Sequence, residues 1–382
     1  MKIIYFISTV GHGLGGHFHS LNTIASEMSK SNEVIVVNIG VKPSSVFSDC
    51  QFDYRFIEFK GFNFLQTLLK LKKIVKIENP DILHAFDLEA FSFVRILSLL
   101  YKKVNFLNKC GGPNPKRYFP HCSNLILFSK ENFNFFINSS NFKNTKLFLI
   151  PNRVNEVRID FSRIESFKLK YKIANINLLR ISRIGRHYES SILQSINLLV
   201  WLKSQDIEVK LIIIGAIQDQ TIYEKLVEYA KNNDVEQEII FETSEEFTNN
   251  ARELLTLGDM VIGTGRNFME ASSLDIKLLV PSIEGNYPII VTNTNFDQVF
   301  LTNFSPRTLI KGFGENQNLS EIKEVLLRKS NFSSKKWFDE YFSSDKVLEK
   351  YSNAYLNSNK FNFRLTSKGL LVNIIYSIRT FI

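Results

Sequence analysis

The stretch INLLRISRIGRHYESSILQSINLLVWLKSQDIEVKLIIIG, residues 176–215, decides the fold class of this chain. Ile176 to Ile181 is predicted to form a strand, and Ser190 to Ser204 is predicted to form a helix. Val209 to Gly215 (VKLIIIG) is predicted as a second strand, and its run of β-branched residues is typical of a central strand buried on both faces. A strand, a helix and a strand in this order predict a βαβ unit with parallel strands.

The same alternation of short apolar runs and helical patterns continues through both halves of the chain. The first half has predicted strands at 2–9, 33–39, 81–86, 104–108 and 125–128, and predicted helices at 17–31, 64–77 and 88–101. The second half adds strands at 237–241, 260–263, 278–280 and 289–291, and helices at 223–233, 246–257 and from 268 onward. We therefore expect an α/β protein with two Rossmann-like domains whose parallel sheets face each other across a ligand-binding cleft.

The boundaries follow from a polar, charged segment between the two halves. Residues 151–172 (PNRVNEVRIDFSRIESFKLKYK) are interpreted as the linker. The predicted domains are 1–160 and 161–345, followed by a helix and a basic amphipathic tail at 346–382.

Length and composition narrow the class of protein. The chain has 382 residues, enough for two or three domains of about 100–200 residues each. Hydrophobic residues make up 44% and charged residues 22%, so disordered, collagen-like, disulfide-scaffold and simple repeat architectures fit poorly. The formal net charge of +9 favours an anionic partner, which could be nucleic acid, a phosphate-bearing ligand or a lipid surface.

The cysteines and the N-terminal segment favour a cytoplasmic protein. Cys50, Cys110 and Cys122 are widely spaced and form no CxxC pair, so neither a disulfide framework nor a structural zinc site is expected. The N-terminal run MKIIYFISTV ends at a glycine-rich loop without an A-x-A site, so it is interpreted as a buried strand. No stretch of about 18 apolar residues predicts a membrane-spanning helix.

The first candidate binding motif is the loop GHGLGG, residues 11–16, between a predicted strand and a predicted helix. Glycines let a ligand approach the backbone, and a helix N-terminus favours an anion, so Gly15 and Gly16 are the pair expected nearest a phosphate or an acceptor. The alternative is a simple tight turn. Because the second strand ends in Asn38-Ile39-Gly40 and not in an acidic residue, the loop lacks the dinucleotide fingerprint, which counts against NAD.

The second motif is a basic cluster at the end of the strand 176–181. Arg180, Arg183, Arg186 and His187 precede a helix whose N-terminus carries two serines. Guanidinium groups at a strand end before a helix suit a diphosphate. The alternative is a solvated charged loop.

The third motif is the segment IGTGRNFME, residues 262–270, where a strand leads into a helix. Gly263, Thr264 and Gly265 leave backbone amides open to a ligand, and Arg266 adds a positive charge. Glu270 can accept hydrogen bonds from sugar hydroxyls, although it could equally be an acidic residue that stabilises the helix dipole.

Taken in order, these motifs resemble the family-4 retaining glycosyltransferases, which have the two-domain GT-B fold. The resemblance covers roughly residues 1–310 and includes DILHAFD, LFLIPNRV, RISRIG, VKLIIIG and GTGRNFMEASSLDIKLLVP. The segment Asn303-Phe304-Ser305-Pro306-Arg307 is similar to an NFSGR-type segment found in members from polysaccharide gene clusters. The first domain would then bind the acceptor and the second the nucleotide sugar, with a last helix that crosses back to the first domain.

The resemblance also implies roles for single residues. Gly15 and Gly16 would lie beside the donor diphosphate, Arg183 would contact phosphate, and Glu270 would hold the donor ribose.

Three positions depart from the family pattern. Ile262 stands where the first glutamate of the E-x7-E motif is expected, Tyr188 where a lysine is expected after Arg183, and Phe86 where the second histidine of an H-x-H pair is expected. Either the donor is bound differently or activity has been lost, and the GTGR loop favours the first reading.

The expected activity is therefore a retaining, hexosyltransferase-type transfer from a UDP- or GDP-sugar to a glycan or lipid-linked acceptor in bacterial surface polysaccharide synthesis (capsule, O-antigen or lipopolysaccharide). Arg183 and Arg186 would stabilise the leaving diphosphate, and Glu270 would hold the ribose. Asp87 is the candidate acceptor-side group, whereas His84 is interpreted as a core histidine. Neither a metal nor another cofactor is expected.

Three other functions remain open. A sugar-nucleotide 2-epimerase would share the fold and would need no acceptor. A non-catalytic binding protein derived from the fold would explain Ile262, Tyr188 and Phe86. A nucleic-acid binder is a weaker alternative, because the basic residues are scattered and no recognised module appears.

The C-terminal segment FNFRLTSKGLLVNIIYSIRTFI, residues 361–382, mixes Arg364, Lys368 and Arg379 with aliphatic residues. It is too short to span a bilayer but suits an interfacial helix beside anionic lipid, which would place a cytoplasmic protein at the inner face of the cytoplasmic membrane. The alternative is a helix packed on the protein body.

Overall fold

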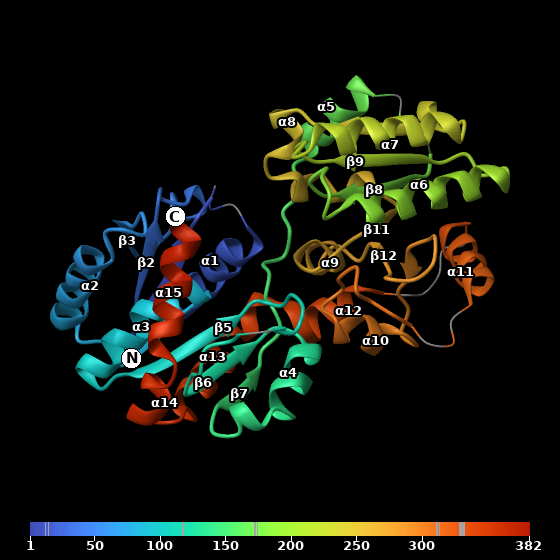
Figure 1. Ribbon diagram of the computed structural model, residues 1–382. Helices are drawn as coiled ribbons and strands as arrows, with labels where there is room; N and C mark the ends of the chain where they lie inside the picture. The colour runs from blue at the N-terminus through green and yellow to red at the C-terminus, as the bar shows by residue number, and fades with distance from the viewer. Residues whose placement is uncertain are drawn as a thin grey trace. The chain divides into compact units, whose positions relative to one another are not determined.

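A computed structural model of the 382-residue chain describes residues 1–11, 13, 15–116, 118–171, 173, 175–310, 312, 314–327 and 333–382. The chain divides into two compact units (Figure 1). Unit 1 comprises Met1–Val154 and Ser344–Ile382, and unit 2 comprises Asn155–Ser343.

Unit 1 is built on a seven-stranded sheet in the order β3-β2-β1-β4-β5-β6-β7, in which every neighbouring pair is parallel. The strands are β1 (Lys2–Thr9), β2 (Glu33–Gly40), β3 (Asp53–Glu58), β4 (Ile82–Ala85), β5 (Val104–Lys109), β6 (Asn124–Leu127) and β7 (Lys146–Leu149). Because β1 pairs with both β2 and β4, the order of connection reverses beside β1, which makes this the switch point of the unit.

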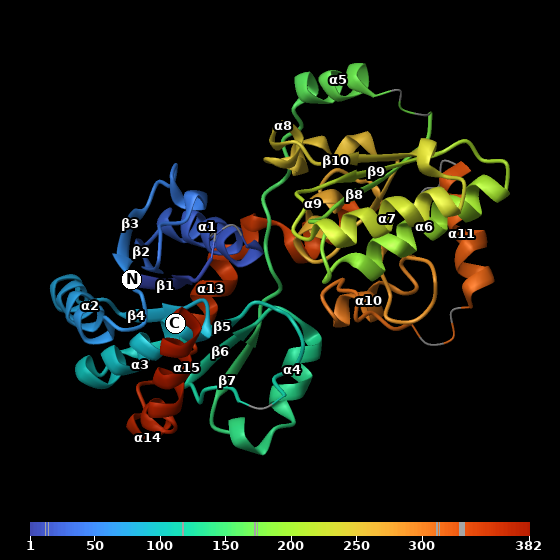
Figure 2. The same ribbon diagram turned by 45° about the horizontal axis from the view of Figure 1, so that its top comes forward.

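Helices cover both faces of this sheet (Figures 1 and 2). The helical elements are α1 (Gly16–Ser29), η1 (Ser45–Phe47), α2 (Phe64–Glu78), α3 (Leu88–Tyr101), α4 (Lys130–Ile137), η2 (Ser140–Phe142), η6 (Ser344–Lys346), α13 (Val347–Leu356), α14 (Phe363–Ser367) and α15 (Leu370–Phe381). One apolar core joins the sheet to α1 and α13, and the other joins it to α2, α3 and α4. Both faces are thus apolar, which explains the nearly continuous hydrophobic runs of the strands.

The C-terminal segment returns to unit 1 at Ser344. Tyr351 and Tyr355 of α13 are buried in the core that contains β1 and α1. The later helices pack on α3, where the buried Arg95 donates from Nε to the carbonyl of Thr366 (2.9 Å). The helix expected at the start of the segment 346–382 corresponds to α13, which begins at Val347 and ends at Leu356.

Unit 2 has a six-stranded sheet in the order β10-β9-β8-β11-β12-β13. The strands are β8 (Asn177–Ile181), β9 (Lys210–Ile214), β10 (Ile239–Glu242), β11 (Met260–Ile262), β12 (Lys277–Val280) and β13 (Ile289–Ile290). All neighbours are parallel except β12 and β13. The first four strands repeat the order of unit 1, with β8 in the place of β1 and β11 in the place of β4.

The helical elements of unit 2 are α5 (Phe161–Lys170), α6 (Glu189–Ser204), α7 (Gln220–Asn232), η3 (Glu236–Glu238), α8 (Glu245–Thr248), η4 (Ala251–Leu257), α9 (Arg266–Ser272), α10 (Phe296–Leu301), α11 (Glu315–Leu327), α12 (Lys335–Trp337) and η5 (Phe338–Phe342). α6, α7 and α11 pack on one face of the sheet through a shared apolar core.

The predicted fold class is confirmed, since both sheets are parallel apart from one edge strand and alternate with helices. The interpretation of 151–172 as a linker is wrong for α5, because Asp160 caps that helix and Ile164 and Phe167 are buried. Lys172 lies outside the described residues.

Candidate functional site

In an open α/β sheet, ligands bind beyond the carboxyl ends of the strands at the switch point, and in unit 2 that point lies between β8 and β11. β8 is followed by the loop 182–188, and β11 is followed by the loop 263–265. The second and third sequence motifs therefore meet at one place in the fold, which we call the unit 2 fork.

The backbone around this fork is tightly packed. A Cβ atom added at Gly215, just after β9, would lie 1.9 Å from the carbonyl oxygen of Ser182. The amide of Ser182 in turn donates to the carbonyl of Ile214 (3.0 Å). Glycine is required here because two strand ends approach too closely for any side chain.

The three clustered arginines have different surroundings. Arg180 is buried in β8, where it donates to the carbonyl of Ile262 (3.1 Å) and to the hydroxyl of Ser191 (2.6 Å), and burial lowers its pKa to about 10. Arg183 is exposed and donates to the Tyr188 hydroxyl (2.6 Å), with its guanidinium 5.3 Å from the centre of that ring. The buried Arg180 thus stabilises the two strand ends of the fork, whereas the exposed Arg183 lies at its surface.

Arg186 lies at the margin of the fork. Its side chain is 84% exposed and donates from Nε to the Asp219 carboxylate (3.2 Å), which also caps α7. An ion pair this exposed contributes little to stability.

The loop after β11 adopts a backbone that requires glycine. Gly265 has φ +50° and precedes α9, and a Cβ atom at Gly263 would lie 2.9 Å from the Cα of Phe268. The amide of Gly265 donates to the carbonyl of Phe304 (3.3 Å) and the amide of Gly263 to the carbonyl of Leu279 (2.9 Å), so the expectation that these two amides are open to a ligand is wrong. Asn303 and Phe304, both at positive φ, therefore lie against this loop.

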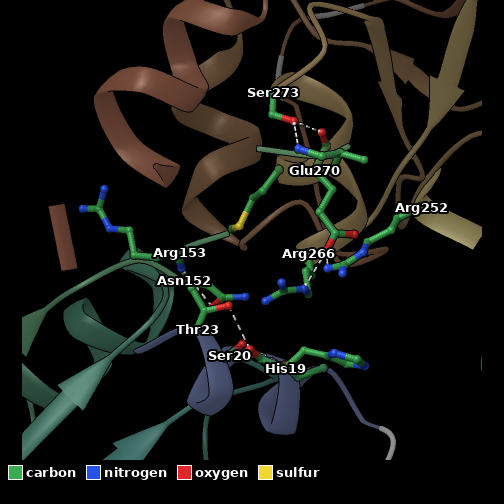
Figure 3. A network of polar contacts seen from close by, with 12 residues as sticks. His19, Ser20, Thr23, Asn152, Arg153, Arg252, Arg266, Glu270 and Ser273 are labelled. Atoms are coloured by element: carbon green, nitrogen blue, oxygen red, sulfur yellow. Dashed lines mark hydrogen bonds and ion pairs between the residues drawn. The ribbon is translucent and has the colours of Figure 1, made fainter. Parts of the chain in front are cut away.

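Two arginines converge on the carboxylate of Glu270 (Figure 3). Arg266 donates from Nε to Glu270 Oε1 (2.8 Å), and Arg252 Nη1 lies 3.7 Å from the same oxygen. Burial lowers the pKa of Arg266, and among the described residues its buried Nη1 has no hydrogen-bond partner. A buried guanidinium nitrogen is costly to leave unpaired.

Two further residues complete this description. Ile262 is fully buried in the core beneath the fork, so its side chain does not reach the surface where a glutamate was expected. Arg252 was missed by the sequence analysis, because a single basic residue in an expected helix gives no signal until η4 brings it beside Glu270.

At the switch point of unit 1, Asp87 follows β4 and begins α3. Its Oδ1 accepts from the amide of Ala90 (2.7 Å) and its Oδ2 from the amide of Ser8 at the end of β1 (2.6 Å). Burial raises the pKa of Asp87. Both oxygens are thus used to cap a helix and to join two strand ends.

The glycine-rich loop of unit 1 shows where glycine is required. Gly13 has φ +70°, and a Cβ atom there would lie 3.0 Å from Cβ of Ser44. Gly15 precedes α1 and Gly16 is its first residue, with open space around a Cβ at Gly16. Gly16 is therefore not required for packing, which leaves room for the expected contact with a ligand. His12 and Leu14 of this loop lie outside the described residues.

Two titratable side chains lie near Asp87. Burial lowers the pKa of His17, and burial together with the charge of Asp87 raises the pKa of Glu89 to about 7. The Glu89 side chain also hydrogen-bonds to Thr380 of α15.

The interpretation of His84 as a core histidine is confirmed. It is fully buried, its Nδ1 lies 2.8 Å from the Tyr355 hydroxyl, and its Nε2 lies 2.9 Å from Oδ1 of Asn108. Burial lowers the pKa of His84 to about 3, so it is neutral at physiological pH.

Within the described part of the chain, no group of three or more His, Cys, Asp and Glu side chains is placed to hold a metal ion. None of the helices formed by those residues is long and apolar enough to cross a bilayer.

Comparison with known proteins gives likeness of structure only. No family model matches the chain, and no curated protein matches its sequence. Anabaena HepE in complex with UDP and glucose superposes with a TM-score of 0.66 over 94% of this chain and 100% of that one, at 16% identity. A glycosyltransferase from Rickettsia africae gives a TM-score of 0.63 over 99% of this chain and 98% of that one, at 13% identity.

A UDP-GlcNAc 2-epimerase from Methanocaldococcus jannaschii gives a TM-score of 0.57 over 94% of this chain and 100% of that one, at 12% identity. At such identities the matches show the fold alone. The chain has the GT-B fold of two Rossmann-like units.

Proposed function

We propose that this protein is a retaining hexosyltransferase that moves a sugar from a UDP- or GDP-sugar to a glycan or lipid-linked acceptor in bacterial surface polysaccharide synthesis (capsule, O-antigen or lipopolysaccharide). The observation that carries this proposal is the buried, unpaired Nη1 of Arg266, beside the glycine loop 263–265 at the unit 2 fork. A preorganised cation is what a diphosphate leaving group needs.

In this proposal the donor occupies the unit 2 fork. Arg183 contacts a phosphate oxygen, Arg266 faces the donor with the backbone of Gly263, Thr264 and Gly265, and Glu270 holds the ribose. Oε1 of Glu270 already accepts from Arg266, so Oε2 is the oxygen left for a ribose hydroxyl. Arg186 was expected to stabilise the leaving diphosphate together with Arg183, but because its side chain is 84% exposed and pairs with Asp219, we assign it only a role in attracting the anionic donor.

Unit 1 contributes the acceptor side. Asp87 acts as a positioning residue, since its oxygens hold the ends of β1 and the start of α3 in place. Gly15 and Gly16 lie at the N-terminus of α1 and leave the backbone open to the donor diphosphate or to the acceptor.

The chemistry is a substitution at the anomeric carbon of the sugar. The bond from that carbon to the diphosphate oxygen breaks, and a bond to the acceptor hydroxyl oxygen forms. The hydroxyl proton leaves with the departing diphosphate, and the arginines stabilise the negative charge that develops there. The chain's own residues supply this stabilisation, and the protein works at the inner face of the cytoplasmic membrane, where lipid-linked acceptors are found.

The test is to incubate the protein with labelled nucleotide sugars, with and without a glycan or lipid-linked acceptor. The proposal predicts acceptor-dependent release of UDP or GDP and a product whose anomeric configuration matches that of the donor. An inverted product would remove the retaining assignment.

A 2-epimerase is the second candidate, because a structure of that activity shares the fold over nearly the whole chain. It predicts an epimeric nucleotide sugar in the reaction without acceptor. If neither product forms but UDP or GDP binds, the protein is a non-catalytic binding protein of this fold.

A further inference from the structure

The last 24 residues of the chain form a surface that the donor site does not use. Residues 359–369 and α15 lie along unit 1 beside α3 (Figures 1 and 2). Side chains fix this segment in place, since Asn124 accepts from the amide of Asn359 (2.7 Å) and Asn373 donates to the carbonyl of Leu88 (3.1 Å). The segment is therefore part of the folded unit.

α15 packs on unit 1 through both polar and apolar residues, since Ile378 and Phe381 contact its apolar core. Its polar residues Asn373 and Ser377 are fully buried against α3, where Ser377 donates to the carbonyl of Glu89 (3.1 Å). Other apolar residues of the helix face outward, with Leu371 69% exposed and Val372 51% exposed. Ile375 and Tyr376 on the next turn are exposed as well. An apolar face turned to the outside marks a contact with an apolar partner.

A basic pocket lies next to the start of α15. This cavity, of about 750 Å³, is formed by Ser123 before β6, by residues 140–144 and by the chain from Asn359 to Lys368. Four cationic residues line it: Lys143, Lys360, Arg364 and Lys368. All four are exposed, and within the described ranges no carboxylate forms an ion pair with them.

The C-terminal part of the sequence carries no acidic residue. No Asp or Glu occurs after Glu349, whereas Lys350, Lys360, Arg364, Lys368 and Arg379 all follow it. Cations beside an exposed apolar face are complementary to a bilayer that contains anionic phospholipid, where each basic residue near the surface contributes about 1 kcal/mol.

A second apolar and basic segment begins where α15 ends. A Cβ atom at Gly61 would lie 2.8 Å from Cγ1 of Ile382, so the end of α15 adjoins the start of α2. Phe62 and Leu65 beside it are exposed. No acidic residue separates Glu58 from Glu78, and five lysines lie between them.

We propose that the basic pocket binds the phosphate headgroup of an anionic phospholipid while the outward face of α15 inserts into the interfacial region of the bilayer. This deepens the proposed function and rests on its membrane location, because it names the surface through which the transferase would reach a lipid-linked acceptor. The pocket and the apolar face together favour a lipid over a soluble phosphate as the ligand, because a soluble phosphate would need the pocket but not the apolar face.

The test is flotation of the full chain with vesicles of neutral phosphatidylcholine and with vesicles that contain about 30% anionic phosphatidylglycerol. We expect binding to the anionic vesicles, and a loss of about tenfold or more in the partition coefficient when Arg364→Glu and Lys368→Glu are combined. The matched control is Lys231→Glu with Lys336→Glu, which changes net charge equally on unit 2 and should leave binding within about twofold.

The apolar face is tested by Leu371→Ser with Ile375→Ser, which should also weaken vesicle binding about tenfold or more. Leu169→Ser with Ile283→Ser, two exposed apolar residues of unit 2, should not. Circular dichroism and UDP binding, measured on every variant, separate a loss of folding or of the donor site from a loss of the membrane surface.

Three outcomes would overturn the inference. The first is equal flotation with neutral and anionic vesicles, and the second is vesicle binding that neither pair of tail substitutions weakens. The third is a protein that does not bind vesicles but forms a dimer in light scattering, which the Leu371→Ser and Ile375→Ser pair dissociates. Transfer to a soluble acceptor should continue in all tail variants, so failure of this inference and failure of the proposed function give different results.

Discussion

The switch point of unit 1 between β1 and β4, which we call the unit 1 fork, has the same backbone geometry as the unit 2 fork but carries different polar groups. The first four strands have the same spatial order in both sheets. In each unit, a glycine at or just after the end of the second strand lies against the end of the first strand. A Cβ at Gly40 would lie 2.2 Å from the carbonyl oxygen of Thr9, and one at Gly215 would lie 1.9 Å from that of Ser182. The same close approach is therefore required twice.

The polar groups above the two forks differ. At the unit 1 fork, both oxygens of Asp87 are occupied by backbone amides of the protein itself. At the unit 2 fork, Arg183 is exposed and Arg266 keeps one buried nitrogen without a partner. This difference supports the proposal that unit 2 binds the anionic donor, whereas the carboxylate of Asp87 in unit 1 holds backbone amides in place.

The largest expected effect concerns Arg183. Arg183→Ala should reduce turnover of a nucleotide sugar by about 100-fold or more, because it removes a cation from the leaving diphosphate. Arg186→Ala is the matched control, since this exposed side chain should change KM only a few-fold and leave kcat unchanged. Steady-state kinetics of both variants make the measurement, and equal losses would contradict the division of roles.

The shared backbone geometry predicts the next effect. Gly40→Ala and Gly215→Ala should each lower the free energy of unfolding by about 3 kcal/mol or prevent folding, because the new Cβ meets a carbonyl oxygen. Gly16→Ala, which adds a Cβ in open space at a helix start, should leave stability unchanged or raise it by up to about 1 kcal/mol. Denaturant titration tests all three. A tolerated Gly215→Ala would mean that the two forks do not share this requirement.

The sequence predicted much of the fold because each domain repeats short apolar strands with amphipathic helices. It did not predict β3 or β7, which lie at the edges of the sheet and are only partly buried. It also took α5 for a linker, since the helix has only two buried residues among many charged ones. Edge elements bury less apolar surface, so their patterns are weak.

The site was predicted in part for a similar reason. Gly263, Gly265, Arg266 and Glu270 are close in sequence, and strand order brings their loop beside that of Arg183. The burial of Arg180, the pairing of Arg252 with Glu270 and the double use of Asp87 depend on contacts between residues far apart in the chain. No local pattern carries that information.

The raised pKa of Glu89, which lies near Asp87 at the unit 1 fork, predicts that the free energy of unfolding depends on pH. The pKa of Glu89 is raised from 4.5 to about 7, so the folded state holds a proton more tightly than the unfolded state, and stability falls as pH rises from about 4.5 to 7. Glu89→Gln should therefore be more stable than the parent by about 1–2 kcal/mol at pH 8 and equal to it near pH 4.5. Unfolding titrations at both pH values, with the exposed Glu236→Gln as control, test this. A pH-independent difference would contradict it.

The smallest expected effect compares the two capping carboxylates. Asp87→Ala should lower the free energy of unfolding by about 1–2 kcal/mol, because it leaves the amides of Ala90 and Ser8 unpaired. Asp219→Ala, which removes the cap of α7 and the exposed partner of Arg186, should cost about 1 kcal/mol or less. Thermal unfolding of both variants gives the comparison. If Asp219→Ala lowers the melting temperature more than Asp87→Ala does, the contact of Asp87 with the amide of Ser8 adds nothing to stability.

The central claim is that the unit 2 fork binds a nucleoside diphosphate, and calorimetric titration with UDP, GDP and CMP tests it most directly. The account predicts that UDP or GDP binds with one site per chain and more tightly than CMP. It also predicts that Arg183→Ala weakens this binding by about tenfold or more, while Asp87→Ala leaves it unchanged. No binding of either diphosphate, or equal binding by the parent and Arg183→Ala, would contradict the claim.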